Sequence, residues 1–219
     1  MSVNPQEGLL QILAAAPVVP VVTVHDAAEG VALARALVAG GLTAIEVTLR
    51  TPAAIEAIGA IAREVPGAVV GAGTVLSRAQ LAAVAAQGAR FAVSPGTSPA
   101  LLAAARESRI PFLPGAATVS EMMTLAEAGF TYQKLFPAEA VGGTALLKSV
   151  AAPLPQLRFC PTGGIDLARA QGYFDLANVI CVGGSWVVPA AAVTSGDWQK
   201  ITDLAAEAAE IPRRFTANF

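Results

Sequence analysis

A single lysine stands in a segment that has the pattern of a buried strand. The segment is TYQKLFP, residues 131–137, and its Lys134 is one of three lysines in the chain, with Lys148 and Lys200. Lysine is rarely buried unless another group pairs with it or uses it. An amine held away from water loses its proton more readily, and the neutral amine can attack a carbonyl to form a Schiff base. The position of Lys134 therefore predicts a nucleophile.

A second strand-like segment, AIEVTLR, carries charged residues at alternate positions. Successive side chains of a strand lie on opposite faces, so Glu46, Thr48 and Arg50 share one face and the apolar residues between them share the other. Glu46 could transfer protons, and Arg50 could hold a substrate carboxylate by two parallel hydrogen bonds. A buried ion pair of Glu46 with Lys134 or Arg50 that serves only the fold is the alternative, but such pairs stabilise little. Charged groups gathered inside an apolar fold favour a site.

Two later strand-like segments end in glycines, at residues 162–164 (TGG) and 183–185 (GGS). Glycines leave backbone N–H groups open to a ligand, and the loops after strands 7 and 8 of a (β/α)8 barrel are its usual phosphate site. Ordinary glycine turns are the alternative. A third glycine pair, at residues 71–73, lacks the spacing of a dinucleotide fingerprint, and we interpret it as close packing inside the fold.

The elements that must position these residues recur about every 20 residues along the chain. Eight strand-like segments alternate with Ala-rich helical patterns, which predicts a closed (β/α)8 barrel, with an open doubly wound sheet as the alternative. We expect one domain over residues 1–219 and an extra helix over residues 5–15 that closes the barrel floor. The strand-like segments span residues 17–24, 42–49, 67–74, 90–95, 110–116, 131–137, 158–164 and 178–185.

Local signals mark the ends of the helices. Glycines typical of helix C-termini stand at positions 40–41, 88 and 129. The N-terminal signals are a cap residue followed by proline, or capping-box spacing; they occur at Thr51-Pro52, Ser98-Pro99, Ser77/Gln80 and Thr118/Glu121.

Composition narrows the possible functions. The chain of 219 residues is 54% hydrophobic and 14% charged, with a net charge of −2, so no basic surface is expected for nucleic acid or an anionic membrane. No apolar run reaches the length of a membrane span, and the N-terminus lacks the basic start of a signal peptide. We therefore expect a cytoplasmic protein. Cys160 and Cys181 are too few for a disulfide scaffold, and we interpret both as small apolar strand residues.

Metal chemistry is not expected. The single histidine, His25, cannot supply the ligand cluster of a zinc-dependent aldolase or hydrolase, and a lone histidine at a strand end is more often solvated. The sequence therefore predicts no metal and no cofactor.

A series of motifs resembles one family over nearly the whole chain. The chain is similar to the bacterial 2-keto-3-deoxy-6-phosphogluconate (KDPG) aldolases, class I enzymes that also act on 4-hydroxy-2-oxoglutarate (KHG). One such motif would be weak, but eight in the same order are specific. They are PVVPVV, AIEVTLRTP, GAGTVL, AVSPG, PGAATVSE, KLFPAE, CPTGGI and CVGGSW.

The resemblance implies a role for each residue that matches a motif. Lys134 forms the Schiff base, and Glu46 is the general acid/base, working partly through a water molecule. The other implied contacts are Arg50 and Thr74 with the pyruvate carboxylate, Pro95 and Phe136 as pocket walls, Thr162 with the substrate chain, and Gly163, Gly164, Gly184 and Ser185 with the phosphate.

The resemblance also implies an activity and an assembly. KDPG is cleaved to pyruvate and D-glyceraldehyde 3-phosphate in the Entner–Doudoroff pathway, by a cytoplasmic homotrimer of barrels that needs no metal. Two alternatives stay open: an aldolase of the galactonate branch (KDPGal), or a phosphate-binding barrel isomerase or synthase without covalent catalysis. A barrel that only binds a small molecule would leave the combination of Glu46 and Lys134 without a use.

Overall fold

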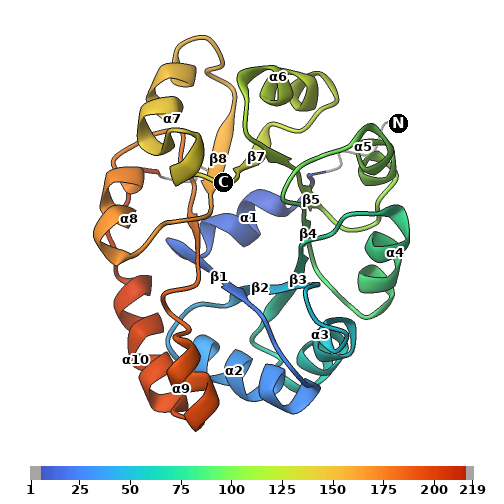
Figure 1. The fold of residues 1–219 in the computed structure, drawn as a ribbon, viewed down its shortest axis with the longest axis vertical. Coiled ribbons are helices and arrows are strands. Elements are labelled where there is room, and N and C mark those ends of the chain that lie inside the picture. The colour runs from blue at the N-terminus through green and yellow to red at the C-terminus, as the bar shows by residue number, and fades with distance from the viewer. Residues whose placement is uncertain (1–5, 216–219) are drawn as a thin grey trace.

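Parallel strands alternate with helices along residues 6–215, which the computed structural model describes (Figure 1). The strands are β1 Val18–Val22, β2 Ala44–Thr48, β3 Val69–Gly73, β4 Ala92–Val93, β5 Phe112–Leu113, β6 Gly115–Ala116, β7 Tyr132–Leu135, β8 Arg158–Pro161 and β9 Val182–Gly184. The α-helices are α1 Leu9–Ala14, α2 Ala27–Ala39, α3 Ala54–Glu64, α4 Arg78–Ala86, α5 Pro99–Arg106, α6 Val119–Glu127, α7 Gly143–Ala151, α8 Leu167–Phe174, α9 Ala190–Ser195 and α10 Trp198–Ala209, and a 3₁₀ helix, η1, spans Glu139–Val141. None of these helices within residues 6–215 is both long and apolar enough to cross a membrane.

The strands form two parallel sheets. One has the order β5-β4-β3-β2-β1-β9 and the other the order β6-β7-β8. The strand expected over residues 110–116 is divided at Pro114 into β5 and β6, because proline has no N–H to donate to a ladder. Isolated pairings of Phe159 with Val179 and of Thr162 with Gly183 connect β8 to the chain at β9. The predicted α/β class with parallel strands is confirmed.

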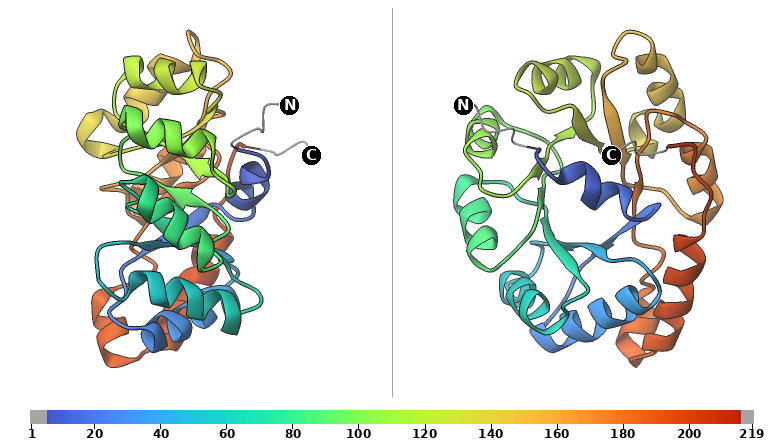
Figure 2. Two further views of the ribbon diagram at one scale, coloured as in Figure 1. Left: turned by 90° about the vertical axis from the view of Figure 1, so that its right-hand side faces the viewer. Right: turned by 180° about the vertical axis from the view of Figure 1, so that it is seen from behind.

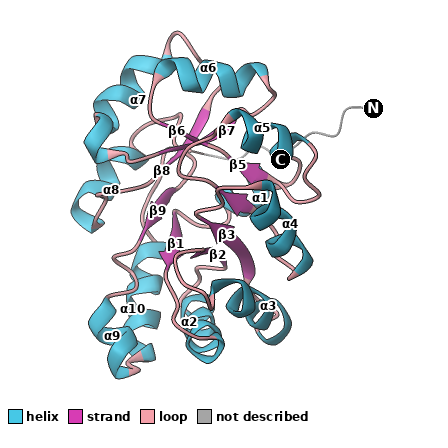
Figure 3. Cartoon of the chain, turned by 45° about the vertical axis from the view of Figure 1, so that its right-hand side comes forward, coloured by secondary structure: helices cyan, strands magenta, loops and turns pink. Residues whose placement is uncertain are grey.

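Most of the helices surround the strands, as Figure 3 shows with the strands in magenta and the helices in cyan. Ile45 and Val47 of β2 belong to the outer core, together with helix residues such as Leu37. Ala44, on the same face as Glu46, belongs to a separate inner cluster with Val19 of β1. The alternation expected for this strand is therefore confirmed, and it leaves Glu46 on the inner face.

Helix α1 lies at one end of the inner cluster, and the views in Figure 2 show it across the end of the ring of helices, projecting to one side. Its Leu9 and Leu13 join that cluster. The preceding Gln6 donates side-chain hydrogen bonds to the carbonyls of Phe112 (3.0 Å) and Tyr132 (2.6 Å), so it spans β5 and β7. The predicted helix over residues 5–15 is thus shorter at both ends, and residue 5 lies outside the described residues.

The end of α1 is held from the other end of the chain. The guanidinium of Arg213 donates hydrogen bonds to the carbonyls of Ala14 (2.5 Å), Ala16 (3.0 Å) and Ile180 (3.1 Å). It therefore joins the chain after α1 to the segment that leads into β9.

The helix starts agree with three of the four N-terminal signals. Ser77, Ser98 and Thr118 each accept a hydrogen bond from the backbone N–H three residues later. In the capping box of α6, Glu121 accepts from the backbone N–H of Ala117 (2.8 Å) and of Thr118 (2.9 Å), and the bond from Ala117 is the main cause that lowers the pKa of Glu121.

The expected N-cap at Thr51 was wrong. Helix α3 begins at Ala54 after Ala53, with no side-chain cap. The Thr51 hydroxyl instead donates to the carbonyl of Val24 at 2.6 Å, so a tertiary contact uses the group that the local pattern assigned to the helix. The predicted glycine ends are confirmed, since Gly41, Gly88 and Gly129 have φ of 91°, 91° and 93°.

Candidate active site

Lys134 and Glu46 meet inside the strands. Nζ of Lys134 on β7 lies 3.0 Å from Oε1 and 3.5 Å from Oε2 of Glu46 on β2, a contact between residues 88 positions apart in sequence. The two residues are only 4% and 3% exposed. The ammonium also lies 5.4 Å from the ring centroid of Phe136. The nucleophile and the proton carrier expected from the sequence are therefore adjacent and shielded from water.

One of the two glycines on β3, Gly73, makes room for this pair. A Cβ atom at Gly73 would lie 2.6 Å from Cγ and 2.7 Å from Cδ of Glu46, well inside van der Waals contact. A Cβ atom at Gly71 would instead overlap the ring of Phe91. The interpretation of this glycine pair as close packing agrees with the structure. At Gly73, the absence of a side chain leaves the space in which the Glu46 carboxylate extends toward Lys134.

The end of β2 is tied to its neighbour β1. The Thr48 hydroxyl donates to the carbonyl of Val22 at 2.9 Å and lies 2.9 Å from the hydroxyl of Thr23. Arg50 follows two residues later in an exposed turn, where its backbone N–H donates to the Thr48 carbonyl at 2.8 Å. Thr48 thus helps to fix the position from which Arg50 projects.

A pocket of about 440 Å³ opens where the strands end. This is within the usual size range of small-molecule sites. Its lining includes residues that follow β2, β7, β8 and β9 and that are far apart in the sequence. Seven of the residues singled out from the sequence line it: Arg50, Phe136, Thr162, Gly163, Gly164, Gly183 and Ser185.

Five predicted site residues lie outside the lining of this pocket: Lys134, Glu46, Thr74, Pro95 and Gly184. Thr74 directly follows β3 and has φ 58°, a left-handed conformation that is uncommon for a β-branched residue and is found mostly at functional sites. Pro95 is half-buried after β4. Gly184 is buried, and a Cβ atom there would overlap the ring of Trp186. The space beside Gly184 is therefore occupied by that ring.

Sequence reasoning missed several residues of the pocket. Glu139 lines it, together with Val21 and Ile165. A Cβ atom at Gly183 would overlap the Thr162 side chain, so this glycine serves the packing of a predicted site residue. The signal for Glu139 was present, because a charged residue follows Phe136 in KLFPAE.

The remaining reactive side chains are one histidine and two cysteines, and Cys160 is paired in register with Lys134 on the neighbouring strand. His25 is exposed, and its Nδ1 lies 3.2 Å from Oε1 of Glu29, which agrees with the interpretation of a solvated histidine. Cys160 and Cys181 are buried, and the hydrogen bond between them together with burial raises the pKa of Cys181. Among residues 6–215 no group of three or more His, Cys, Asp or Glu could hold a metal ion.

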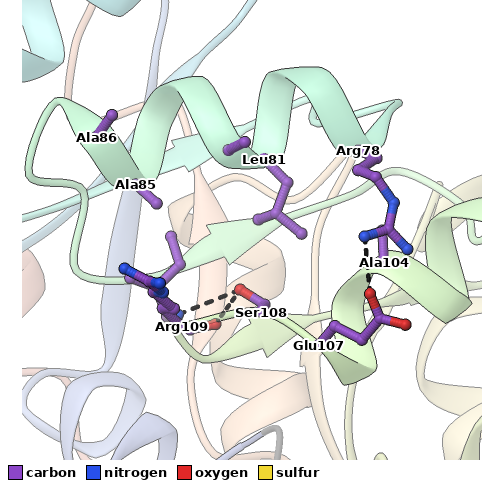
Figure 4. Close-up of a pocket in the computed structure, with 10 residues that line it drawn as sticks. Arg78, Leu81, Ala85, Ala86, Ala104, Glu107, Ser108 and Arg109 are labelled. Atoms are coloured by element: carbon purple, nitrogen blue, oxygen red, sulfur yellow. Dashed lines mark hydrogen bonds and ion pairs between the residues drawn. The ribbon is translucent and has the colours of Figure 1, made fainter.

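A second pocket, of about 410 Å³, lies between α4 and α5 (Figure 4). It is lined mainly by apolar side chains such as Leu81 and Ala104. Arg78 Nη1 and Glu107 Oε2 form an exposed ion pair across it at 2.8 Å. None of the residues predicted for the site lines this pocket.

Comparison with known proteins gives one consistent result. The family model "KDPG and KHG aldolase" matches residues 9–204. The chain is 54% identical over 198 residues to the 2-dehydro-3-deoxy-phosphogluconate aldolase of Dickeya dadantii, covering 90% of this chain and 93% of that one.

Solved structures give the same result. A KDPG aldolase from Legionella pneumophila, with pyruvate captured as a covalent carbinolamine intermediate, has a TM-score of 0.90 and 43% identity and covers 96% of this chain and 100% of its own. The aldolase of Zymomonas mobilis with 3-phosphoglycerate has a TM-score of 0.90 and 45% identity and covers 97% and 100%. Motifs, fold and relatives agree, and the chain belongs to the KDPG and KHG aldolase family.

Proposed function

We propose that the protein is a class I aldolase that cleaves KDPG to pyruvate and D-glyceraldehyde 3-phosphate, and that it also cleaves KHG. The observation that carries this proposal is the buried contact of 3.0 Å between Lys134 Nζ and Glu46 Oε1 beside a pocket of suitable size. A buried amine that only balanced a charge would not need a neighbouring pocket. The Legionella relative, in which pyruvate is captured as a carbinolamine, supports the same chemistry.

The lysine begins the reaction. Nζ of Lys134 adds to C2 of the keto acid, and loss of water from the resulting carbinolamine gives a protonated Schiff base. The C3–C4 bond then breaks as the C4 hydroxyl gives up its proton, and the electron pair of that bond passes to the iminium. Glyceraldehyde 3-phosphate leaves and an enamine of pyruvate remains. Protonation at C3 and hydrolysis release pyruvate and restore the amine.

Glu46 handles the protons of this sequence. Its carboxylate, at 3.0 Å, can accept a proton from the Lys134 ammonium, which leaves the neutral amine that attacks. The same group then moves protons at the carbinolamine and at the C4 hydroxyl, directly or through a water molecule. Arg50 and Thr74 hold the carboxylate of the substrate, and Pro95 and Phe136 form the walls around its pyruvyl part.

The other end of the substrate requires a place for the phosphate. We assign it to Gly163, Gly164, Gly184 and Ser185, with Thr162 against the carbon chain. Gly163 and Gly164 have φ of 104° and 78°, conformations that glycine adopts readily, and both line the pocket. The 3-phosphoglycerate in the Zymomonas relative supports a site for a phosphorylated three-carbon unit.

Borohydride trapping tests the covalent step. Reduction in the presence of pyruvate should inactivate the protein irreversibly and add the pyruvyl mass to the peptide that contains Lys134. Borohydride alone is the control. A label on Lys148 or Lys200, or no label, would overturn the assignment.

Two alternatives are separated by substrate tests. A galactonate-branch aldolase would cleave KDPGal, which differs from KDPG at one stereocentre, with higher kcat/KM than KDPG. A phosphate-binding isomerase or synthase would keep its activity after borohydride and pyruvate, since it would use the glycines but not the amine. The similarity to relatives named for KDPG favours the gluconate branch.

We further infer a closed barrel of eight strands in one domain over residues 1–219. Two observations support closure: β5 and β6 are one strand interrupted at Pro114, and the pairing of Thr162 with Gly183 brings β8 to β9. By resemblance to the family, we propose a cytoplasmic homotrimer in the Entner–Doudoroff pathway. Light scattering during gel filtration tests the trimer.

A further inference from the structure

Glu139 is a carboxylate on the wall of a pocket to which we assign an anion. It lies in η1, directly after β7, and lines the pocket together with Gly163 and Gly164. A negative charge at this place should by itself repel a phosphate. The contacts of Glu139 show what else it does.

Both oxygens of the Glu139 carboxylate have side-chain partners. The Tyr173 hydroxyl donates a hydrogen bond to Oε1, and Nε of Arg169 lies 3.4 Å from Oε2. Arg169 in turn pairs through Nη1 with Asp166 at 2.5 Å. Tyr173 is only 1% exposed, and its burial, followed by the hydrogen bond to Glu139, raises its pKa well above the ordinary value. The phenol therefore stays protonated and remains a donor.

The stem of Glu139 and its backbone lie against the glycine turn. A Cβ atom at Gly164 would be 2.8 Å from both Cβ and Cγ of Glu139, so the turn and the stem are in direct contact. The backbone N–H of Glu139 donates to the Gly163 carbonyl at 3.2 Å, and that of Ala138 donates to the Thr162 carbonyl at 2.8 Å. The segment after β7 thus supports the turn after β8 at three successive residues.

We propose that Glu139, anchored by Tyr173 and Arg169, is a positioning residue that holds the Gly163–Gly164 turn in its phosphate-binding form. The role rests on the proposed function, because it needs a phosphate at this turn. Tyr173 and Arg169 bind the carboxylate oxygens of Glu139 and partly neutralise its charge. The stem of Glu139 can therefore pack against Gly164. Unlike Lys134, neither Glu139 nor Tyr173 needs to touch the reacting atoms.

The direction in which phosphate affinity changes in a Glu139 variant distinguishes support of the turn from repulsion of the phosphate by the carboxylate. Glu139→Ala removes the stem and the charge at a partly exposed position, where alanine should fold. Inorganic phosphate should compete with the substrate at this site, and loss of the charge alone would strengthen its binding. Loss of the support should weaken it, and we expect the inhibition constant of phosphate to rise roughly fivefold to tenfold. An unchanged or lower inhibition constant would overturn the proposal.

The anchor is tested with a smaller change. Tyr173→Phe removes one hydroxyl and keeps the ring in the core, and Tyr132→Phe is the matched control because Tyr132 is the other tyrosine and packs near α1. We expect Tyr173→Phe to lower kcat/KM for KDPG roughly fivefold, mainly through KM, while kcat/KM for unphosphorylated KHG stays within about twofold. Tyr132→Phe should change neither. An equal loss on both substrates, or no loss, would contradict the positioning role.

A double variant checks that the two residues act as one unit. If Tyr173 acts through Glu139, the Glu139→Ala/Tyr173→Phe protein should bind phosphate about as weakly as Glu139→Ala alone. Independent effects that simply add would refute the coupling. Phosphate inhibition of the wild-type protein distinguishes failure of the phosphate site from failure of the Glu139 role. Failure of phosphate to inhibit wild-type protein would overturn the phosphate site together with this role, whereas normal inhibition with an unaltered Tyr173→Phe would overturn this role alone.

Discussion

The space that Gly73 leaves for Glu46 leads to a sharp prediction. In Gly73→Ala the new Cβ would begin 2.6 Å from Cγ of Glu46, where carbon atoms prefer about 3.5–4.0 Å. The carboxylate must therefore move by about 1 Å, and its contact with Lys134, now 3.0 Å, would lengthen to about 4 Å, beyond hydrogen-bond distance. A displacement of this size can lower turnover about 100-fold.

The same substitution two residues earlier is a matched control. Gly71→Ala also adds a methyl group to the inner face of β3, but it presses on the ring of Phe91 instead of Glu46. Each variant should lose about 1–3 kcal/mol of unfolding free energy from overpacking. Only Gly73→Ala should lose turnover in addition, and Gly71→Ala should retain most of it.

The assay compares stability and chemistry in the two proteins. Urea unfolding gives the stability of each, and pyruvate release from KDPG gives kcat. Exchange of the pyruvate methyl protons with deuterium should fall together with kcat in Gly73→Ala if Glu46 moves those protons, as we propose. If Gly73→Ala lost stability but kept both kcat and exchange, the placement of Glu46 would not matter, and the reasoning from its contact with Lys134 would be refuted.

Four further outcomes are expected. Lys134→Arg should fold but be nearly inactive, because arginine keeps the charge and cannot lose its proton to attack; substantial turnover would contradict the nucleophile. Glu46→Gln should lower kcat roughly 100-fold, whereas a change confined to KM would make Glu46 a binding residue. EDTA should leave turnover intact, and loss that zinc or magnesium restores would count against the Schiff base. The lowered pKa of Glu121 stabilises the fold above the ordinary pKa of 4.5 and ceases to do so as pH falls through the lowered value, so Glu121→Gln should be less stable than wild type near neutral pH, with the difference in urea unfolding shrinking in acid.

The sequence was most informative where side-chain type and strand parity act together. Alternation placed Glu46 inward and Ile45 outward, and the rarity of lysine in an apolar strand singled out Lys134. Local capping signals were reliable at Ser98 and Thr118, where no tertiary partner competes. They failed at Thr51, whose hydroxyl binds a carbonyl of a neighbouring segment.

Contacts between distant segments could not be predicted from one sequence. Glu139 and Tyr173 are 34 positions apart, and nothing in either local pattern indicates that they meet. The division of a strand at Pro114 and the Trp186 ring beside Gly184 likewise depend on how neighbouring segments pack. The residue types were visible in the sequence, but their separations in space were not.

The anchoring of α1 has a consequence for the order in which the chain acquires its structure. Gln6 binds backbone groups 106 and 126 positions away, and Arg213 binds the carbonyl of Ala14 across 199 positions. During synthesis the contacts of Gln6 must wait until residue 132 has left the ribosome, and the contact of Arg213 must wait until residue 213 has done so. Contacts of such long range slow folding, because the entropy of closing the loop is lost before the contact forms. The apolar residues Leu9 and Leu13 are synthesised early but reach their final burial late, so a nascent chain keeps them available to chaperones until the strands of the inner cluster have emerged.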